Sequence, residues 1–206
     1  MATDKDIVNY ALMELGELSV DTFPNPNNRA AEIANTYFSS SKLETQELFY
    51  WNESIQRVTL STSSYSASFE YNNAYEIPSN SIDIISVNEN YIDSPSAYYA
   101  IEDGYILADE QGGDINVKYV KEINSTDMSN RVARIFGMVL AKNICIPLTG
   151  NGNLKNSIID RLEKLELPRA RYKQGATQNI MKAHPKSKWL GARNNGFTHQ
   201  AYYRTY

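Results

Sequence analysis

Hydrophobic side chains near the start of the chain recur with the spacing of an amphipathic helix. Ile7, Ala11 and Leu15 stand four residues apart and therefore lie on one helical face. Thr3 belongs to the residue types that cap helix N-termini, so the sequence predicts a first helix that begins there. A loop with two prolines follows, and a second, longer helix is expected over about residues 28–49.

From about residue 55 the pattern changes to alternation of polar residues with β-branched or aromatic ones, which is typical of half-buried strands. The segments with this pattern are RVTLST, SFEYNN, AYEIP, DIISVNEN, AYYAIEDGYILADE and INVKYVKE. Asp103-Gly104 is the strongest hairpin signal in the chain, because both residue types tolerate the positive φ angles of a tight turn. The sequence therefore predicts a small antiparallel β domain over residues 55–123.

Helical spacing returns after residue 124. Asp127 or Ser129 can cap a third helix, which we expect to end at Pro147. Leucine and isoleucine then repeat with helical spacing over residues 154–165. Pro168 is expected to kink this fourth helix or to restart it, because its ring removes one backbone hydrogen bond.

This order of elements predicts an α+β fold. The N-terminal helices (residues 1–54) and the C-terminal helices (residues 124–184) are expected to close one antiparallel helical bundle. The β domain of residues 55–123 is an insertion into that bundle. Residues 185–206 lack any periodicity and are expected to form an extended tail.

Charge is segregated along the chain. No Asp or Glu occurs after Glu166, whereas residues 167–206 hold eight Lys or Arg residues. The first 166 residues carry the other 12 basic residues and all 24 acidic ones, so this body has a net charge of −12 and the last forty residues have +8. A basic, aromatic end on an acidic body indicates a partner for that end, either nucleic acid or an acidic protein surface.

Signals for catalysis or metal binding are weak. The two histidines, His184 and His199, fall in or beside the expected tail and have no acidic sequence neighbour, and Cys145 stands among apolar residues. The chain contains no Walker A loop, dinucleotide fingerprint, zinc-protease motif or nucleophile elbow. We therefore expect no enzyme activity, no cofactor and no metal. With no continuous apolar run of membrane length and no signal peptide, the chain is expected to be soluble, without a membrane partner, and made in the cytoplasm.

Several stretches of the sequence resemble one known family, in order and at the right separations. They are NYALMELGE (9–17), NRAAEIANTYFSSSKLETQELFYWNES (28–54), YEIPSNSIDIISV (75–87), AIEDGYILADEQGGDINVKYV (100–120) and FGMVLAKNICIPLTGN (136–151). They are similar to stretches of the head-to-tail adaptor proteins of short-tailed phages, also called tail tubular protein A or head–tail connector proteins. The resemblance covers roughly residues 5–180.

The resemblance implies a structural protein of the virion. Such proteins form a ring, usually twelvefold, between the portal and the tail nozzle, and they line the conduit through which double-stranded DNA is ejected. This implies a homo-oligomer at the head–tail junction. Its partners are the portal, the nozzle or other tail proteins, and double-stranded DNA passes through it without sequence-specific binding. We expect the tail to dock on the portal through aromatic anchors and cations, namely Lys186, Lys188, Trp189, Leu190, Arg193, Phe197, Tyr202, Tyr203, Arg204 and Tyr206.

Two other functions remain open from the residues alone. The basic, aromatic tail also suits a nucleic-acid-binding protein, because cations and stacking rings together bind single strands. The β region is rich in tyrosine, which suits ordinary strand packing, a sheet face that meets another protein, or a tail protein that binds or hydrolyses a sugar.

Overall fold

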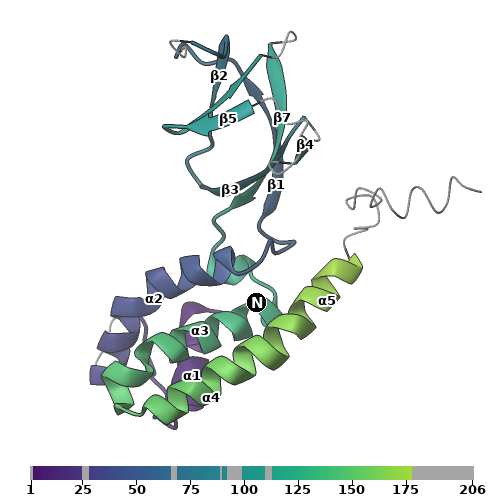
Figure 1. The fold of residues 1–206 in the computed structure, drawn as a ribbon. Helices are drawn as coiled ribbons and strands as arrows, with labels where there is room; N and C mark the ends of the chain where they lie inside the picture. Colours follow the sequence, from purple (N-terminus) through teal and green to yellow (C-terminus); the bar gives the residue numbers. More distant parts are fainter. Residues whose placement is uncertain are drawn as a thin grey trace, which may run out of the picture.

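The computed structural model of this protein describes residues 2–24, 28–65, 69–88, 90–91, 99–109 and 113–177. These residues form a helical part and a β part, which stand one above the other in Figure 1. The chain starts in the helical part, passes through the β part and returns to the helical part. The mixed α+β class and the antiparallel sheets that the sequence predicts are confirmed.

The first two helices begin at side-chain caps. Before α1 (Asp4–Glu14), Thr3 Oγ1 accepts a hydrogen bond from Asp6 N at 3.2 Å, and Asp6 Oδ2 accepts one from Thr3 N at 2.9 Å. This reciprocal pair satisfies two N–H groups that lack a partner within the helix. Asn28 caps α2 (Arg29–Glu47) in a similar way, with its side-chain oxygen 2.8 Å from a backbone nitrogen. Both predicted helices are confirmed.

The third helix, α3 (Asn130–Thr149), is the centre of the helical part and packs against α1, α2 and α4. Its N-terminal half shares one hydrophobic cluster with Ile7, Trp51 and Leu167. Its C-terminal half shares a second cluster with residues of α1 and α2. By length and composition α3 is apolar enough to cross a membrane, although 61% of the qualifying stretch is buried inside the protein. This packing against the other helices accounts for the hydrophobicity of α3.

The prediction that Pro147 ends α3 is wrong. Helical backbone continues to Thr149, and Gly150 with a φ of +65° terminates it. A proline in the last turn removes only one backbone hydrogen bond, and the surrounding bonds hold the turn. Thr149 Oγ1 donates to Cys145 O at 2.7 Å, and Gly150 N donates to Ile146 O at 3.0 Å.

The last helices form one continuous rod. It consists of α4 (Gly152–Arg161), five π-helical residues (Leu162–Glu166) and α5 (Leu167–Thr177). Pro168 is the second residue of α5 and has no N–H to donate to the preceding turn, which accounts for a widened turn at this point. Leu167 N bonds to Leu162 O across that turn. Pro168 therefore marks a restart of the helix, one of the two outcomes that the sequence predicts.

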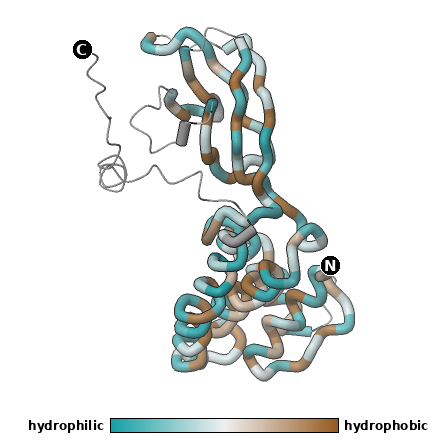
Figure 2. The backbone as a smooth tube through the Cα atoms, turned by 90° about the vertical axis from the view of Figure 1, so that its right-hand side faces the viewer, coloured by the Kyte–Doolittle hydropathy of each residue, from teal (hydrophilic) through white to brown (hydrophobic). Residues whose placement is uncertain are grey.

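The β part consists of two antiparallel sheets. Its strands are β1 (Ile55–Ser61), β2 (Asn73–Glu76), β3 (Ser81–Val87), β4 (Asn90–Tyr91), β5 (Tyr99–Glu102), β6 (Tyr105–Ala108) and β7 (Asp114–Lys121). One sheet has the order β1-β7-β3-β4 and the other has the order β2-β6-β5. Hydrophobic and hydrophilic positions alternate along these strands in Figure 2. The inward-facing residues form one core, in which Tyr75 and Tyr119 are buried, so these two tyrosines serve strand packing.

One turn prediction is confirmed and one strand prediction is wrong. Asp103 and Gly104 join β5 to β6 with φ angles of +46° and +81°, as a tight hairpin requires. The segment SFEYNN was expected to form a strand, but residues 69–72 form a bend. Glu70 has a φ of +74°, and Tyr71 N bonds back to Phe69 O at 2.9 Å, so the backbone there turns instead of extending.

The chain crosses between the two parts at a well-bonded joint. At the exit, Trp51 is fully buried and its Nε1 donates to Thr45 O at 2.8 Å. Ser54 O accepts a hydrogen bond from Lys121 N at 2.7 Å, so the outgoing and returning segments are bonded directly. From α5, Gln174 Oε1 accepts from Asn52 N at 3.2 Å. These bonds fix the direction in which the β part leaves the helices.

Candidate functional site

The docking residues predicted from the sequence lie outside the described residues. All ten, from Lys186 to Tyr206, belong to the segment beyond Thr177, as do both histidines. The candidate site therefore consists of residues that the structure does describe.

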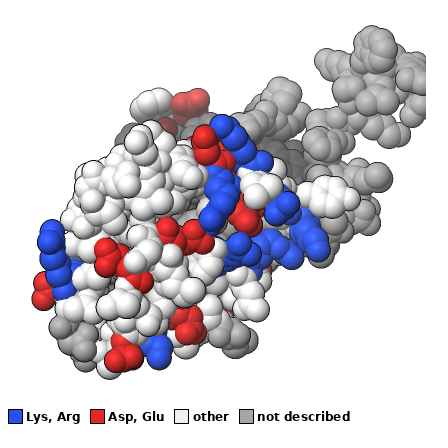
Figure 3. Space-filling model, turned by 90° about the horizontal axis from the view of Figure 1, so that it is seen from below, with Lys and Arg blue, Asp and Glu red and all other residues white. Residues whose placement is uncertain are grey.

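Cations from two distant parts of the sequence meet in a groove between α3 and α5. We use the name basic groove for the hollow of about 640 Å³ lined by Arg131 and Arg134 of α3 and by Arg169 and Lys173 of α5. Tyr172, whose side chain is 78% exposed, also lines it. Seen from below in Figure 3, most Lys and Arg side chains on that face gather on the right, the side on which α5 lies in Figure 1.

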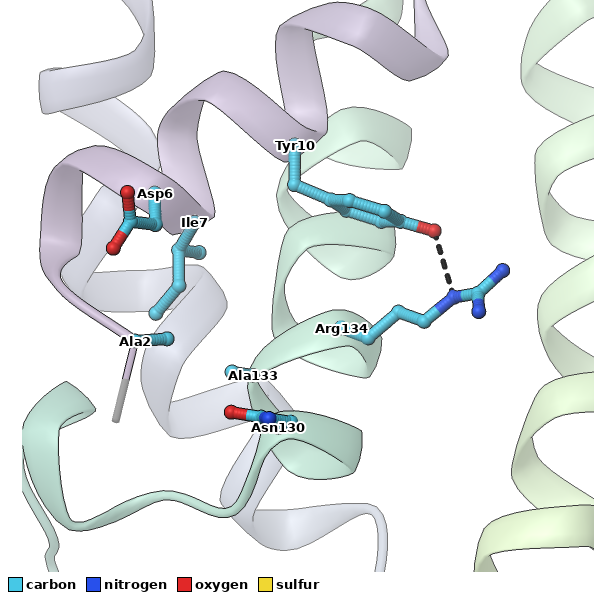
Figure 4. Close-up of a pocket in the computed structure, with 7 residues that line it drawn as sticks. All are labelled: Ala2, Asp6, Ile7, Tyr10, Asn130, Ala133 and Arg134. Atoms are coloured by element: carbon cyan, nitrogen blue, oxygen red, sulfur yellow. Dashed lines mark hydrogen bonds between the residues drawn. The ribbon is translucent and has the colours of Figure 1, made fainter.

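A second hollow of about 280 Å³ adjoins the basic groove at Asn130 and Arg134. Figure 4 shows Tyr10 and Arg134 reaching toward each other across it, from α1 and α3. Arg134 Nε donates to Tyr10 Oη at 2.9 Å, and the guanidinium carbon lies 5.7 Å from the centre of the tyrosine ring. This contact holds Arg134, one of the four cations of the groove, in a defined position against α1.

The electrostatics of this contact follow from burial and neighbouring charge. The hydrogen bond from Arg134 to Tyr10 raises the pKa of the guanidinium, with Glu166 adding to the effect. Burial, followed by the hydrogen bond and charge of Glu14, raises the pKa of the Tyr10 hydroxyl above 10.0. Arg134 is therefore charged and Tyr10 neutral near neutral pH.

The positions of Arg131 and Arg134 oppose the usual charge pattern of a helix start. The N-terminal end of a helix carries partial positive charge, so acidic side chains are favoured there and cations are not. The first turn of α3 contains no acidic residue, and Ser129 occupies the cap position without a side-chain hydrogen bond. The cations and the helix end thus add to the same positive potential, which favours a bound anion.

One carboxylate lines the groove among the residues that the structure describes. Glu166, in the π-helical turn, lies 3.5 Å from Arg134 and has a side chain that is 15% exposed. This single ion pair leaves the groove with three more cations than anions. Its chemistry is therefore that of a binding surface for carboxylates or phosphates.

No group of three or more metal-ligating side chains occurs among the described residues. Cys145 is buried and its Sγ lies 3.6 Å from Thr149 Oγ1. These features leave the basic groove as the best-defined candidate site.

Comparison with known proteins adds no assignment. The chain matches no protein-family model, and no curated protein matches it.

Sequence reasoning identified the cations of α5 as part of a basic end but missed their partners on α3. Arg131 stands 38 residues before Arg169, so their proximity depends on how α5 folds back along α3. A local signal was nevertheless present in the sequence. Two arginines at the start of a helix, without an acid in its first turn, conflict with the helix dipole and indicate another role.

Proposed function

We propose that this chain is a structural subunit of the connector ring at the head–tail junction of a short-tailed phage. The observation that carries the proposal is the set of five resembling stretches, which occur in the family's order. In this proposal α1 and α2 pack with α3, α4 and α5 as one antiparallel bundle that forms the body of the ring. The β part is the inserted domain that faces the tail nozzle.

The joint supports such a role. A ring that connects two assemblies must hold its two contact regions in a fixed relation to each other. Buried Trp51 and the hydrogen bonds of Ser54 and Gln174 restrain the β part relative to the helices. Restraint of this kind suits a structural subunit.

Charge supports it as well. A body with a net charge of −12 repels DNA phosphates, so a duplex passing through a channel lined by such subunits would not adhere. The basic, aromatic residues after 185 would then dock on the portal, with Trp189 and Phe197 as anchors and Lys186 and Arg193 as cationic contacts.

Electron microscopy of the purified full chain mixed with its portal tests the proposal directly. We expect rings stacked on the portal vertex. We expect deletion of residues 186–206 to abolish portal binding while the helices of the remaining chain, followed by circular dichroism, stay intact. A chain with Trp189→Ala alone is the milder variant. Portal binding that survives the deletion would exclude the docking role of the tail, and absence of rings with the intact chain would exclude the connector function.

The basic groove favours one second candidate, a nucleic-acid-binding protein. The groove places Arg131 and Arg134 of α3 together with Arg169 and Lys173 of α5, and a groove lined by four cations suits a phosphate backbone. A gel shift with single- and double-stranded DNA at rising salt tests this function. Steeply salt-dependent binding that is lost on Arg131→Glu supports it, and binding that is insensitive to this substitution contradicts a role for the groove.

A further inference from the structure

A second exposed patch lies at the C-terminal end of α1, and its residues are separate from those that line the basic groove. We use the name acidic knob for Met13, Glu17, Leu18 and Asp21, at the end of α1 and in the loop after it. The side chains of Leu18 and Met13 are 86% and 70% exposed, and both acids are exposed. An exposed apolar patch rimmed by polar residues is typical of a site that contacts another protein.

The acidic knob is held in shape before any partner binds. Gly16 has a φ of +74°, and the backbone N–H groups of Gly16 and Glu17 bond to Met13 O and Leu12 O at 3.1 and 2.9 Å, which closes the end of α1. The side chain of Asn9 then pairs with both backbone polar groups of Val20, at 2.7 and 3.1 Å. A loop fixed in this way loses little entropy on binding.

The chain's own C-terminal segment cannot neutralise the basic groove with side chains. Residues 167–206 contain no Asp or Glu, so a carboxylate partner must come from another part of the molecule or from another molecule. In the same copy, no residue of the acidic knob lines the basic groove. The remaining sources of an anion are the carboxylates of a second copy or of another protein, and the phosphates of nucleic acid.

Charge complementarity favours a second copy over nucleic acid. The acidic body that repels phosphate would attract the groove of a neighbour. The groove also offers exposed Tyr172 beside its cations, which matches an apolar anchor flanked by acids. The two surfaces consist of different residues, so a contact between them is head-to-tail and repeats from copy to copy.

We propose that the basic groove of one copy receives the acidic knob of the next copy in the ring. Leu18 and Met13 pack beside Tyr172, and Glu17 and Asp21 approach the cations of α3 and α5. This inference rests on the proposed ring-forming function and identifies the surfaces that join neighbouring subunits.

Charge reversal and its rescue test the contact in the full chain. Arg131→Glu with Arg169→Glu is expected to weaken self-association about tenfold or more, and Glu17→Lys with Asp21→Lys to do the same. The four substitutions combined restore opposite charges and are expected to regain assembly. The variant Arg131→Glu also places an acid in the first turn of α3, which favours the helix and protects the fold. Arg57→Glu with Lys121→Glu, in the β part, makes the same change in net charge as Arg131→Glu with Arg169→Glu and serves as the control for that pair.

Assembly is measured by sedimentation velocity of the chain alone and by electron microscopy on the portal. If the wild-type chain forms rings and a groove variant forms them equally well, this inference is overturned and the connector function stands. A wild-type chain that forms no ring in either setting would overturn both. A groove variant that assembles normally but loses DNA binding would assign the groove to phosphate and also overturn the inference.

Cross-linking between two different chains gives an independent readout. One chain carries Leu18→Cys and the other Tyr172→Cys, both exposed positions, while native Cys145 is buried. A short bismaleimide is expected to give covalent dimers only when the two chains are mixed. Equal dimer yields from either chain alone would contradict a head-to-tail contact between these two surfaces.

Discussion

Gln46 and Ile123 are separated by 77 positions in the sequence, yet the side-chain amide of Gln46 pairs with both backbone polar groups of Ile123. Gln46 Nε2 donates to Ile123 O at 3.3 Å, and Ile123 N donates to Gln46 Oε1 at 3.0 Å. Both residues are buried. The side chain of Gln46, near the end of α2, thus satisfies the backbone N–H and C=O of Ile123, just after β7. This pair connects the helical part to the segment that returns from the β part.

Replacing Gln46 by Met should lower the free energy of unfolding by about 2–4 kcal/mol. Methionine has a similar size, but it leaves the N–H and C=O of Ile123 buried without these partners. The measurement is urea denaturation followed by circular dichroism. Glu47→Met, at the neighbouring exposed position, is the control and should change stability by less than about 0.5 kcal/mol. Equal urea midpoints for Gln46→Met and the wild type would contradict the role of this pair.

Gly137 permits the close approach of α1 to α3. A Cβ at this position would lie 2.5 Å from Cδ1 of Tyr10, and the Cγ and Cβ of Tyr10 are also within 3.3 Å. Gly137→Ala should therefore cost about 1–3 kcal/mol, because the base of the tyrosine side chain cannot move aside without shifting α1.

The sign of this effect should reverse when the ring is removed. In a Tyr10→Ala background, Gly137→Ala should stabilise the protein by up to about 1 kcal/mol, since alanine is the better helix former. Thermal unfolding of the four chains of this cycle measures both effects. An equal cost of Gly137→Ala in both backgrounds would exclude the contact with Tyr10 as its cause.

Arg57 and Lys118 stand directly opposite each other on β1 and β7. Burial, and then the charge of Arg57, lowers the pKa of Lys118 below 10.5. Because the folded state binds this proton less tightly than the unfolded state, stability from this group increases as pH rises through the folded pKa toward 10.5. The like-charge pair thus destabilises the sheet at neutral pH.

Arg57→Glu should stabilise the protein by about 0.5–1 kcal/mol at pH 7, because it replaces repulsion with attraction across the strands. Arg57→Gln removes only the repulsion and should have a smaller effect. Urea denaturation at pH 7 and at pH 11 checks the sign, since the advantage of the glutamate should shrink once Lys118 is neutral. A lower stability for Arg57→Glu than for Arg57→Gln at pH 7 would refute this interpretation.

The cap of α1 should respond to acid. The hydrogen bond from the backbone N–H of Thr3, followed by the bond from its hydroxyl, lowers the pKa of Asp6 below 3.8. Asp6 therefore contributes stability at higher pH, and this contribution is lost as pH falls through its folded pKa. Asp6→Asn should lower the melting temperature at pH 7 but make little difference in strong acid. Asp4→Asn, which keeps the Thr3–Asp6 pair, is the control, and a constant difference between Asp6→Asn and the wild type at all pH values would contradict the prediction.

Local chemistry explains which elements the sequence predicts well. Thr3 and Asn28 identify two helix starts because a cap depends on residues within one turn, and Asp103-Gly104 identifies a hairpin for the same reason. The end of α3 was missed because the last turn of a helix can tolerate Pro147 when neighbouring bonds hold it.

Features that depend on distant parts of the chain could not be predicted from the pattern. The pairing of Gln46 with Ile123 requires that the chain, after passing through the β part, return to the point where it left the helices. The basic groove requires α5 to fold back so that Arg169 reaches the level of Arg131. Gln46 and Ile123 carry no local signal of their pairing, and the arginines of α3 indicate another role without indicating their partners on α5. Only the three-dimensional arrangement gives each set of residues a shared role.

The hydrogen bond between Ser54 and Lys121 has a consequence for how this architecture can change. Because the chain leaves and re-enters the helices at adjacent points, we expect that the residues between these points can differ in length and sequence without changing the spacing of the helices. A different insert with equally close ends could be exchanged there by recombination, and the helices would still meet in the same way. The helical part can in this sense accept a different inserted domain without any change in its own packing.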